Sequence, residues 1–263
     1  MGLTCREVIE GLERAYPPSC AESWDNVGLL VGRMDADVEK VFVALDLTGE
    51  VLEEAIGWGA DLIVTHHPMI FQGIKRVNDQ DFIGKKILAL AESHTACYAM
   101  HTNFDVLAMA DINEKLLGLK DTEVLMVTGE DQEGHPRGIG RVGMLEPAMD
   151  LESCARFVKE RFDLPGVKVC GDLKKMIHRA AVSGGAGKSM VTSAVSSGAQ
   201  VLITGDIDHH TALDAADQGL CIIDAGHYGT EYFFIEHTKD GLEKMFPQLT
   251  LGCAKKHIPF VEL

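Results

Sequence analysis

The chain begins with an apolar stripe of helical period. Val8, Ile9 and Leu12 fall on one face of a helix, and Thr4 and Glu7 have the spacing of a capping box. A pair of prolines then interrupts the pattern. The sequence therefore predicts a helix over residues 5–16.

Strand and helix patterns alternate after this first helix. Apolar runs of four to eight residues are typical of buried strands, and the longer amphipathic stretches between them are typical of helices. The predicted elements are a strand over 40–47, a helix over 49–59, a strand over 61–65, a helix over 81–94, a strand over 96–100, a loop over 101–105 and a helix over 111–118. This alternation indicates an α/β fold.

The second half of the chain repeats this alternation. Residues 41–67 align without a gap on residues 180–206 at an offset of 139, the difference between Gly198 and Gly59. Any two strand-helix-strand units share such a rhythm, but the matched Gly-Ala turns favour an internal duplication. Residues 120–180, between the two patterns, contain no Ser/Gly-rich or proline-rich linker.

Composition narrows the classes of partner. The 263 residues carry 40 acidic and 24 basic side chains, a net charge of -16. Nucleic acids and membrane surfaces require a basic face, so we expect neither as a partner and favour a small-molecule substrate. The seven cysteines form no CxxC pair, and no apolar run is long enough to span a membrane. We therefore expect reduced thiols and a cytoplasmic protein.

Two glycine-rich segments resemble nucleotide-binding motifs but do not meet all the requirements of those motifs. Residues 138–143, GIGRVG, match the dinucleotide pattern, but a loop precedes them and no helix follows, so we predict a glycine-rich strand. Residues 184–189, GGAGKS, lack the first glycine of a phosphate loop, because Val182 occupies that position. We interpret this second segment as a turn between a strand and a helix.

Histidines and carboxylates gather where strands are predicted to end, an edge at which α/β sheets commonly form sites. The clustered residues are His66, His67, His101, Asp105, Asp206, His209, His210, His227 and Glu231. Imidazole and carboxylate ligands together suit zinc, iron, manganese or nickel, and no cysteine belongs to the set. His227 and Glu231, four residues apart, would share one face of a helical turn. The sequence thus predicts a metal site.

Five segments in this order resemble the motif series of the Nif-three-like family, whose bacterial members are often labelled GTP cyclohydrolase 1 type 2 homologues. The segments are residues 23–32, 61–71, 101–105, 204–210 and 224–231. The resemblance implies two intertwined, duplicated α/β units with mixed sheets, a centre of two divalent metal ions, and a ring-shaped homohexamer. We place the first repeat at residues 1–120 and the second at 121–263, intertwined as one compact unit.

The resemblance also implies roles for individual residues. Carried over position by position, the metal ligands are His66, His67, Asp105, His227 and Glu231. His101, Asp206 and His210 then lie near the ions rather than on them. We expect His101 and His210 to be the catalytic proton shuttles.

Two ions with such ligands suit metal-assisted hydrolysis. The first hypothesis is a hydrolase of the GTP cyclohydrolase type, which adds water to the purine ring of GTP and opens it. A phosphoesterase or amidohydrolase with the same centre is a second possibility, and a metal-binding adaptor or regulatory protein without turnover is a third. In the segment SWDNVGL, we expect Trp24 to pack against the sheet while Asp25 and Asn26 fix a turn near the site.

Overall fold

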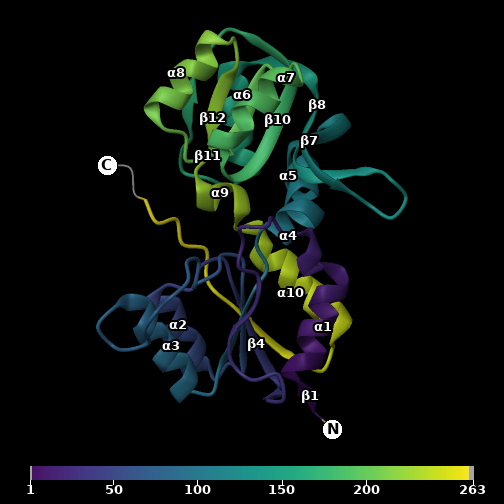
Figure 1. The fold of residues 1–263 in the computed structure, drawn as a ribbon. Coiled ribbons are helices and arrows are strands. Elements are labelled where there is room, and N and C mark those ends of the chain that lie inside the picture. Colours follow the sequence, from purple (N-terminus) through teal and green to yellow (C-terminus); the bar gives the residue numbers. More distant parts are fainter. Residues whose placement is uncertain (1, 261–263) are drawn as a thin grey trace. The chain divides into compact units, whose positions relative to one another are not determined.

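The computed structural model describes residues 2–260 and divides into two units (Figure 1). The chain starts in unit 1, passes to unit 2 after Phe104, returns to unit 1 over Tyr232–His257, and rejoins unit 2 at Ile258. These boundaries differ from the division at residue 120 that the repeated motifs suggested. The difference arises because each half of the sequence contributes a segment to both units.

Unit 1 is built on a five-stranded sheet. In spatial order its strands are β13 (Thr250–Cys253), β4 (Lys40–Ala44), β5 (Leu62–Thr65), β6 (Ala96–Ala99) and β2 (Gly28–Val31). The first four are mutually parallel, and β2 pairs antiparallel with β6. Every residue of β5 and β6 is buried, as expected for strands covered on both faces.

Helices and two short strands complete unit 1. They are β1 (Leu3–Thr4), α1 (Cys5–Ala15), η1 (Pro18–Cys20), β3 (Asp37–Val38), α2 (Gly49–Trp58), α3 (Phe82–Glu92), α4 (Thr102–Phe104) and α10 (Phe233–Met245). The predicted capping box of α1 is present, with the Thr4 side chain accepting from the Glu7 amide. The α2 helix ends at Gly59, whose left-handed φ of 82° favours glycine.

Unit 2 is built on a six-stranded sheet. In spatial order its strands are β7 (Lys120–Glu130), β8 (Pro136–Asp150), β10 (Met176–Ala186), β11 (Val201–Gly205), β12 (Cys221–Asp224) and β9 (Lys168–Cys170). The three strands β10, β11 and β12 are parallel, while β8 and β9 pair antiparallel with their neighbours. The segment GIGRVG lies within β8, which confirms the prediction of a glycine-rich strand.

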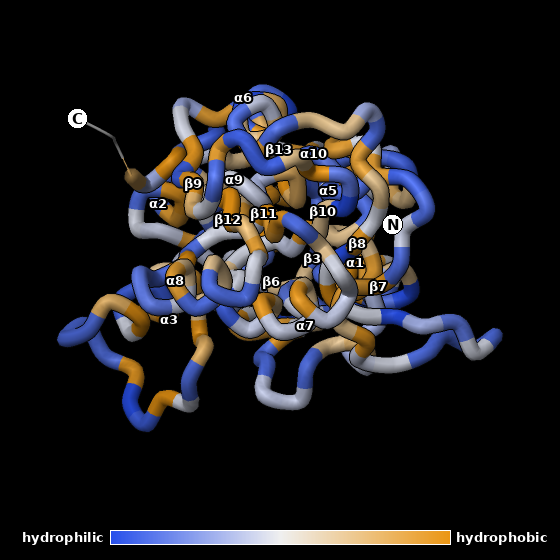
Figure 2. The backbone as a smooth tube through the Cα atoms, turned by 90° about the horizontal axis from the view of Figure 1, so that it is seen from above, coloured by the Kyte–Doolittle hydropathy of each residue, from blue (hydrophilic) through white to orange (hydrophobic). Residues whose placement is uncertain are grey.

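The helices of unit 2 are short. They are η2 (Asp105–Met109, a π-helix), α5 (Ala110–Leu117), α6 (Leu151–Arg161), η3 (Gly187–Met190), α7 (Val191–Ser196), α8 (His209–Asp217) and α9 (His227–Glu231). The segment GGAGKS connects β10 to η3 and α7, as the turn interpretation predicts. Figure 2 shows β11 and β12 as hydrophobic segments, whereas exposed loops are largely hydrophilic.

One prediction about local structure is wrong. Residues 101–105 were expected to form a loop, but they contain α4 and the start of η2. The Asp25 side chain accepts a hydrogen bond from the Thr102 amide (3.0 Å), and the Phe104 amide donates to the His101 carbonyl (2.8 Å). A carboxylate from a distant segment thus satisfies the free amide at the start of the turn, a contact that local periodicity does not reveal.

The two sheets contain the same four-stranded arrangement, which confirms the duplicated α/β fold. The order β4-β5-β6-β2 in unit 1 corresponds to β10-β11-β12-β9 in unit 2, with the same strand directions. The helix that follows each core lies in the other unit, because α5 contacts β8 and β10, whereas α10 contacts β4 and β13. The repeats are therefore intertwined.

Two further expectations can be compared with the described residues. All seven cysteines lie within them and are free thiols, four of them buried. Among the described helices, none has both the length and the apolar character required to span a membrane.

Candidate functional site

Three histidines of unit 1 converge at the carboxyl ends of neighbouring strands. His66 and His67 directly follow β5, and His101 lies two residues after the end of β6. The imidazole centroids of His66 and His67 are 4.9 Å apart, and His101 lies 5.2 Å and 5.5 Å from them. Each ring offers a nitrogen within 4.8 Å of those of the other two. Because the strand ends at this point, the adjacent side chains do not point to opposite faces.

Hydrogen bonds fix the tautomer of each of these imidazoles. Each Nδ1 atom meets an oxygen that can only accept from it: the Met100 carbonyl at 2.8 Å for His66, the Asp46 carboxylate at 2.7 Å for His67, and the Asp25 carboxylate at 2.9 Å for His101. With Nδ1 protonated, Nε2 carries the lone pair. This is the arrangement that metal-binding histidines use, so the three residues fit a borderline divalent ion.

The segment SWDNVGL positions two loops of unit 1. The buried Asp25 carboxylate accepts from the His101 ring and from the Thr102 hydroxyl, the latter at 2.5 Å. Burial by itself raises the pKa of Asp25, but these hydrogen bonds outweigh that effect and hold the pKa well below its usual range. The Asn26 side chain donates to the Ile70 carbonyl at 2.5 Å. Both residues therefore fix turns, as expected.

Trp24, in the same segment, does not pack against the sheet. Its side chain is 58% exposed and contacts the rings of Phe71 and His101. The expectation that Trp24 packs against the sheet is wrong, because the hydrogen bonds of Asp25 and Asn26 hold this loop beside the histidines.

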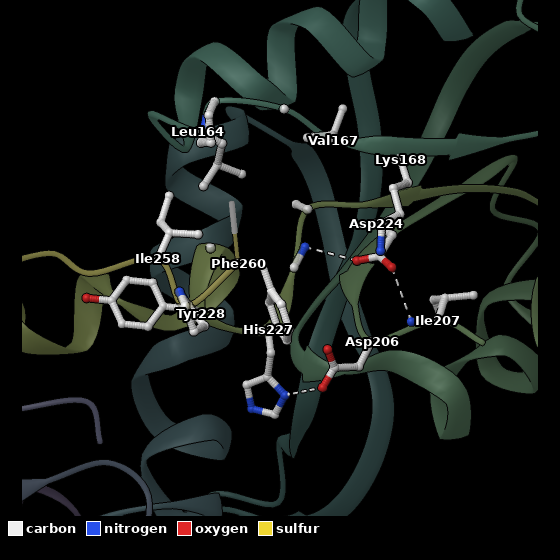
Figure 3. A pocket seen from close by; sticks show the side chains of 16 residues that line it. Leu164, Val167, Lys168, Asp206, Ile207, Asp224, His227, Tyr228, Ile258 and Phe260 are labelled. Carbon is white, nitrogen blue, oxygen red and sulfur yellow. Dashed lines mark hydrogen bonds and ion pairs between the residues drawn. The ribbon is translucent and has the colours of Figure 1, made fainter. Parts of the chain in front are cut away.

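In unit 2, the helix α9 presents two of the predicted ligands. His227 and Glu231 are one turn apart, and their Nε2 and Oε2 atoms are separated by 3.2 Å. The His227 Nδ1 atom donates to Asp206 Oδ2 at 2.8 Å (Figure 3), which again leaves Nε2 with the lone pair. Glu231 and Asp105 offer carboxylate oxygens within 4.8 Å of each other. His227 with Glu231, and Asp105 with Glu231, thus offer imidazole and carboxylate ligands of the kind that a divalent ion binds.

Two glycines of the GGAGKS segment make room for Glu231. A Cβ atom on Gly184 would lie 3.3 Å from Glu231 Cγ, and one on Gly185 would lie only 2.4 Å from Glu231 Oε1. Gly185 also has a φ of +65° and donates its amide hydrogen to the Thr230 hydroxyl at 2.9 Å. The turn therefore supports the buried carboxylate, a role that its sequence did not reveal.

A cavity of about 340 Å³ lies beside His227 in unit 2 (Figure 3). Its lining includes the apolar side chains of Leu164, Val167, Ile258 and Phe260 and the polar side chains of Lys168, Asp206 and Asp224. Asp224 accepts from the amides of Gly226 and Ile207, which fixes the entry into α9. The segments that contribute the apolar wall carry no recognisable motif, so this cavity could not be predicted from sequence.

The remaining candidates occupy different environments. His210 is exposed in the first turn of α8, where its ring contacts His209 at 5.3 Å, and it joins no cluster of ligating side chains among residues 2–260. Its catalytic role stays a prediction. Asp46, which orients His67, was missed by the sequence analysis, although its position two residues after β4 was an available signal.

The sequence also matches known proteins. Residues 3–258 match the family Duf34/NIF3 (NGG1p interacting factor 3). The chain belongs to this family. A NIF3-family relative from Clostridium acetobutylicum is 35% identical over 234 residues, which cover 88% of this chain and 87% of the relative. One from Streptococcus pneumoniae is 37% identical over 236 residues, covering 88% and 86%. Both relatives are named GTP cyclohydrolase 1 type 2 homolog.

Solved structures of the NIF3 family have the same fold. A hypothetical protein of Staphylococcus aureus superposes with a TM-score of 0.91 and 30% identity and covers all of both chains. A Bacillus cereus protein described as related to NIF3 superposes with a TM-score of 0.90 and 26% identity over 99% of each chain. The recognition from motifs and the predicted fold class are both confirmed.

Proposed function

We propose that this NIF3-family protein is a metal-dependent hydrolase of the GTP cyclohydrolase type that acts on a small-molecule substrate. Its ligands for two divalent ions are His66, His67, Asp105, His227 and Glu231. The observation that carries the proposal is the hydrogen bonding of the imidazoles: the Nδ1 atoms of His66, His67 and His227 each meet an oxygen acceptor, the arrangement in which histidines bind a metal ion through Nε2. The names of the curated relatives favour the cyclohydrolase type.

The chain's own residues have distinct tasks in this proposal. Two bound divalent ions supply a nucleophile from water at neutral pH and stabilise developing negative charge. His101 takes up or releases a proton at Nε2, since Asp25 holds its Nδ1. Asp46 and Asp206 keep His67 and His227 in the ligating tautomer. His210 is the second candidate for proton transfer.

Turnover assays test the hydrolase proposal. Protein reconstituted with iron, manganese, zinc or nickel is incubated with GTP and with panels of phosphoesters and amides. Opening of the purine ring of GTP that stops on addition of a chelator supports the cyclohydrolase type. Turnover of only a phosphoester or an amide moves the assignment to another dinuclear hydrolase. A blank across all panels favours the adaptor without turnover.

Metal analysis tests the ligand set. We expect about two ions per chain in the wild type after anaerobic loading. Glu231→Gln keeps the size of the side chain but removes a charge that offsets two dications, so occupancy should collapse. His67→Ala should lose one ion. His101→Ala is the matched control and should retain both ions while turnover falls.

Elemental analysis beside far-ultraviolet circular dichroism separates loss of metal from loss of fold. If His101→Ala strips metal as thoroughly as Glu231→Gln, then His101 is a ligand, which its distance from His66 and His67 would permit. If Glu231→Gln keeps both ions, the proposed role of α9 is wrong.

Assembly and location are proposed on other grounds. We propose a homohexamer, in keeping with the family resemblance, and light scattering that shows a monomer at micromolar concentration would contradict it. We also propose a cytoplasmic location, which the seven free thiols favour.

A further inference from the structure

Two aromatic side chains of unit 1 stand exposed beside the histidines. Trp24 is 58% and Phe71 is 53% exposed, and their ring centroids are 5.9 Å apart at an interplanar angle of 55°. Both rings meet the His101 imidazole edge-on, at 6.0 Å and 76° for Trp24 and at 6.3 Å and 71° for Phe71. We call Trp24 and Phe71 the aromatic corner.

Hydrogen bonds hold the aromatic corner in place. Asp25, next to Trp24, accepts a hydrogen bond from the His101 ring. Asn26 donates a hydrogen bond to the carbonyl of Ile70, the residue before Phe71. On the other side of Trp24, the Glu22 amide donates to the Thr102 hydroxyl at 2.8 Å. These hydrogen bonds connect the loops of Trp24 and Phe71 to each other and to His101. Both exposed rings therefore lie on backbone segments that are held in place.

Exposing two large apolar rings is unfavourable in water, and a fixed apolar surface beside polar groups is a common feature of ligand sites. Two half-exposed rings offer only about 200 Å² between them, given ~150–250 Å² for a whole aromatic side chain. A standard protein interface buries about 800 Å² per partner. The dimensions of the corner therefore favour a small planar ligand over a protein.

We propose that the aromatic corner binds a planar nitrogen heterocycle of the purine class. This inference rests on the proposed function, because it names the part of the substrate that unit 1 recognises. A purine that stacks parallel to the face of Trp24 is inclined by 55° to the Phe71 ring, so its contact with Phe71 is tilted rather than stacked. The bound ring then lies beside His101, the proposed proton shuttle. Trp24 and Phe71 act as binding and orienting residues.

Tryptophan fluorescence of the full-length, metal-loaded protein tests this proposal. The chain has two tryptophans, so a Trp58→Phe background leaves Trp24 as the single reporter. The probes are GMP, which carries the purine ring, and ribose 5-phosphate, which retains the phosphate but lacks the ring. We expect GMP to quench Trp24 emission and ribose 5-phosphate to leave it unchanged.

Calorimetric titration in the wild-type background measures the contribution of each ring. Trp24→Ala should raise the Kd for GMP about tenfold or more, by analogy with bases that stack on aromatic side chains. Phe71→Ala should have a smaller effect, because Phe71 offers a tilted contact rather than a stacked one, and Trp24→Phe should restore part of the affinity. Phe82→Ala is the matched control. Phe82 is 70% exposed in the same unit, but its ring contacts the Lys86 ammonium instead of the aromatic corner.

Several results would overturn the inference. An unchanged Kd for GMP in Trp24→Ala would do so, as would wild-type protein that does not bind GMP. If Trp24→Ala changes the oligomeric mass but not the affinity for GMP, the aromatic corner belongs instead to an interface between copies of this chain. Failure of the proposed function looks different: GTP is not turned over, while GMP binding still depends on Trp24.

Discussion

The two units carry the same four-stranded core but differ at the ends of corresponding strands. In unit 1, β5 is followed by His66 and His67, whereas in unit 2, at the offset of 139 residues, the matching positions are Gly205 and Asp206. A Cβ atom on Gly205 would lie 2.4 Å from the backbone nitrogen of His227. The close approach of α9 thus prevents unit 2 from carrying a histidine where unit 1 has one.

A difference of the same kind occurs one strand earlier. Asp46, which orients His67, corresponds at the same offset to Gly185, where a side chain would meet the Glu231 carboxylate. In both cases unit 2 has a glycine where unit 1 has a functional side chain. The comparison shows that the scaffold of a duplicated fold can be kept while its strand ends acquire different chemistry.

We expect the largest effect from a truncation that removes the part of unit 1 encoded in the second half of the sequence. A chain that ends at Glu231 lacks α10 and β13, both of which belong to unit 1. Phe234 and Leu242 are fully buried, and burial of such side chains stabilises by about 1.5–3 kcal/mol each. We expect unit 1 to unfold while unit 2, which keeps its sheet, resists limited proteolysis.

A chain that ends at His257 is the control for this truncation. It retains α10 and β13, so both units should stay protected. Equal protection of unit 1 in the two shortened chains would show that α10 is dispensable and that the repeats are less interdependent than the fold indicates.

We expect an intermediate effect on the free energy of unfolding from substitution of Gly205, which lies where unit 1 has His66. Gly205→Ala forces a Cβ atom against the backbone of His227, and overpacking of this kind costs about 1–3 kcal/mol or more. Gly57→Ala in α2 is the matched control, because a Cβ there meets no heavy atom within 4 Å and should stabilise the helix by ~0.5–1 kcal/mol. Urea unfolding of both variants should show opposite signs, and equal midpoints would refute the packing argument.

The smallest predicted effect concerns two corresponding N-caps. Asp208 caps α8 by accepting from the Thr211 amide at 3.0 Å and also pairs with Lys188 at 2.9 Å. The hydrogen bond from the Thr211 backbone, and then the contact with Lys188, hold the pKa of Asp208 well below its usual range. A carboxyl whose pKa is lowered by folding stabilises the protein above its unfolded pKa of about 4 and loses that contribution as the pH falls.

Asp208→Asn preserves the cap but cannot ionise, so stability should depend less on pH between pH 5 and about 2. Asp81→Asn, at the N-cap of α3, is the control, since Asp81 forms no ion pair among residues 2–260. Urea midpoints at neutral and acidic pH measure both variants. If the stability of Asp208→Asn falls with decreasing pH as much as that of the wild type, ionisation of Asp208 beside Lys188 does not contribute to the pH dependence.

The sequence predicted those parts of the fold that depend on local pattern. The helix after Thr4, the strands that contain Val43 and Val64, and the duplication at the Gly59 turn all follow from periodicity and turn chemistry. The convergence of His66, His67 and His101 also followed, because parallel strands end at the same edge of a sheet.

Contacts between distant segments could not be predicted in this way. The helical turn after His101 depends on Asp25, and the space for Glu231 depends on Gly185. Trp24 is exposed because hydrogen bonds of its neighbours position its loop, whereas hydrophobicity alone favours burial. In each case the deciding partner lies tens of residues away, so no window along the sequence contains it.

The exchange of helices between the units has a consequence for protein synthesis. In unit 1, β13 pairs with β4 in the register Thr250 to Lys40, so this pair forms only after almost the whole chain has been made. Residues 105–231 of unit 2 are contiguous and leave the ribosome earlier. At ~5–20 residues per second, unit 1 waits roughly seven to thirty seconds for its last helix and strand. The half of the protein that is translated first is therefore the last to reach its native state, and during that interval its nascent sheet lacks an edge partner.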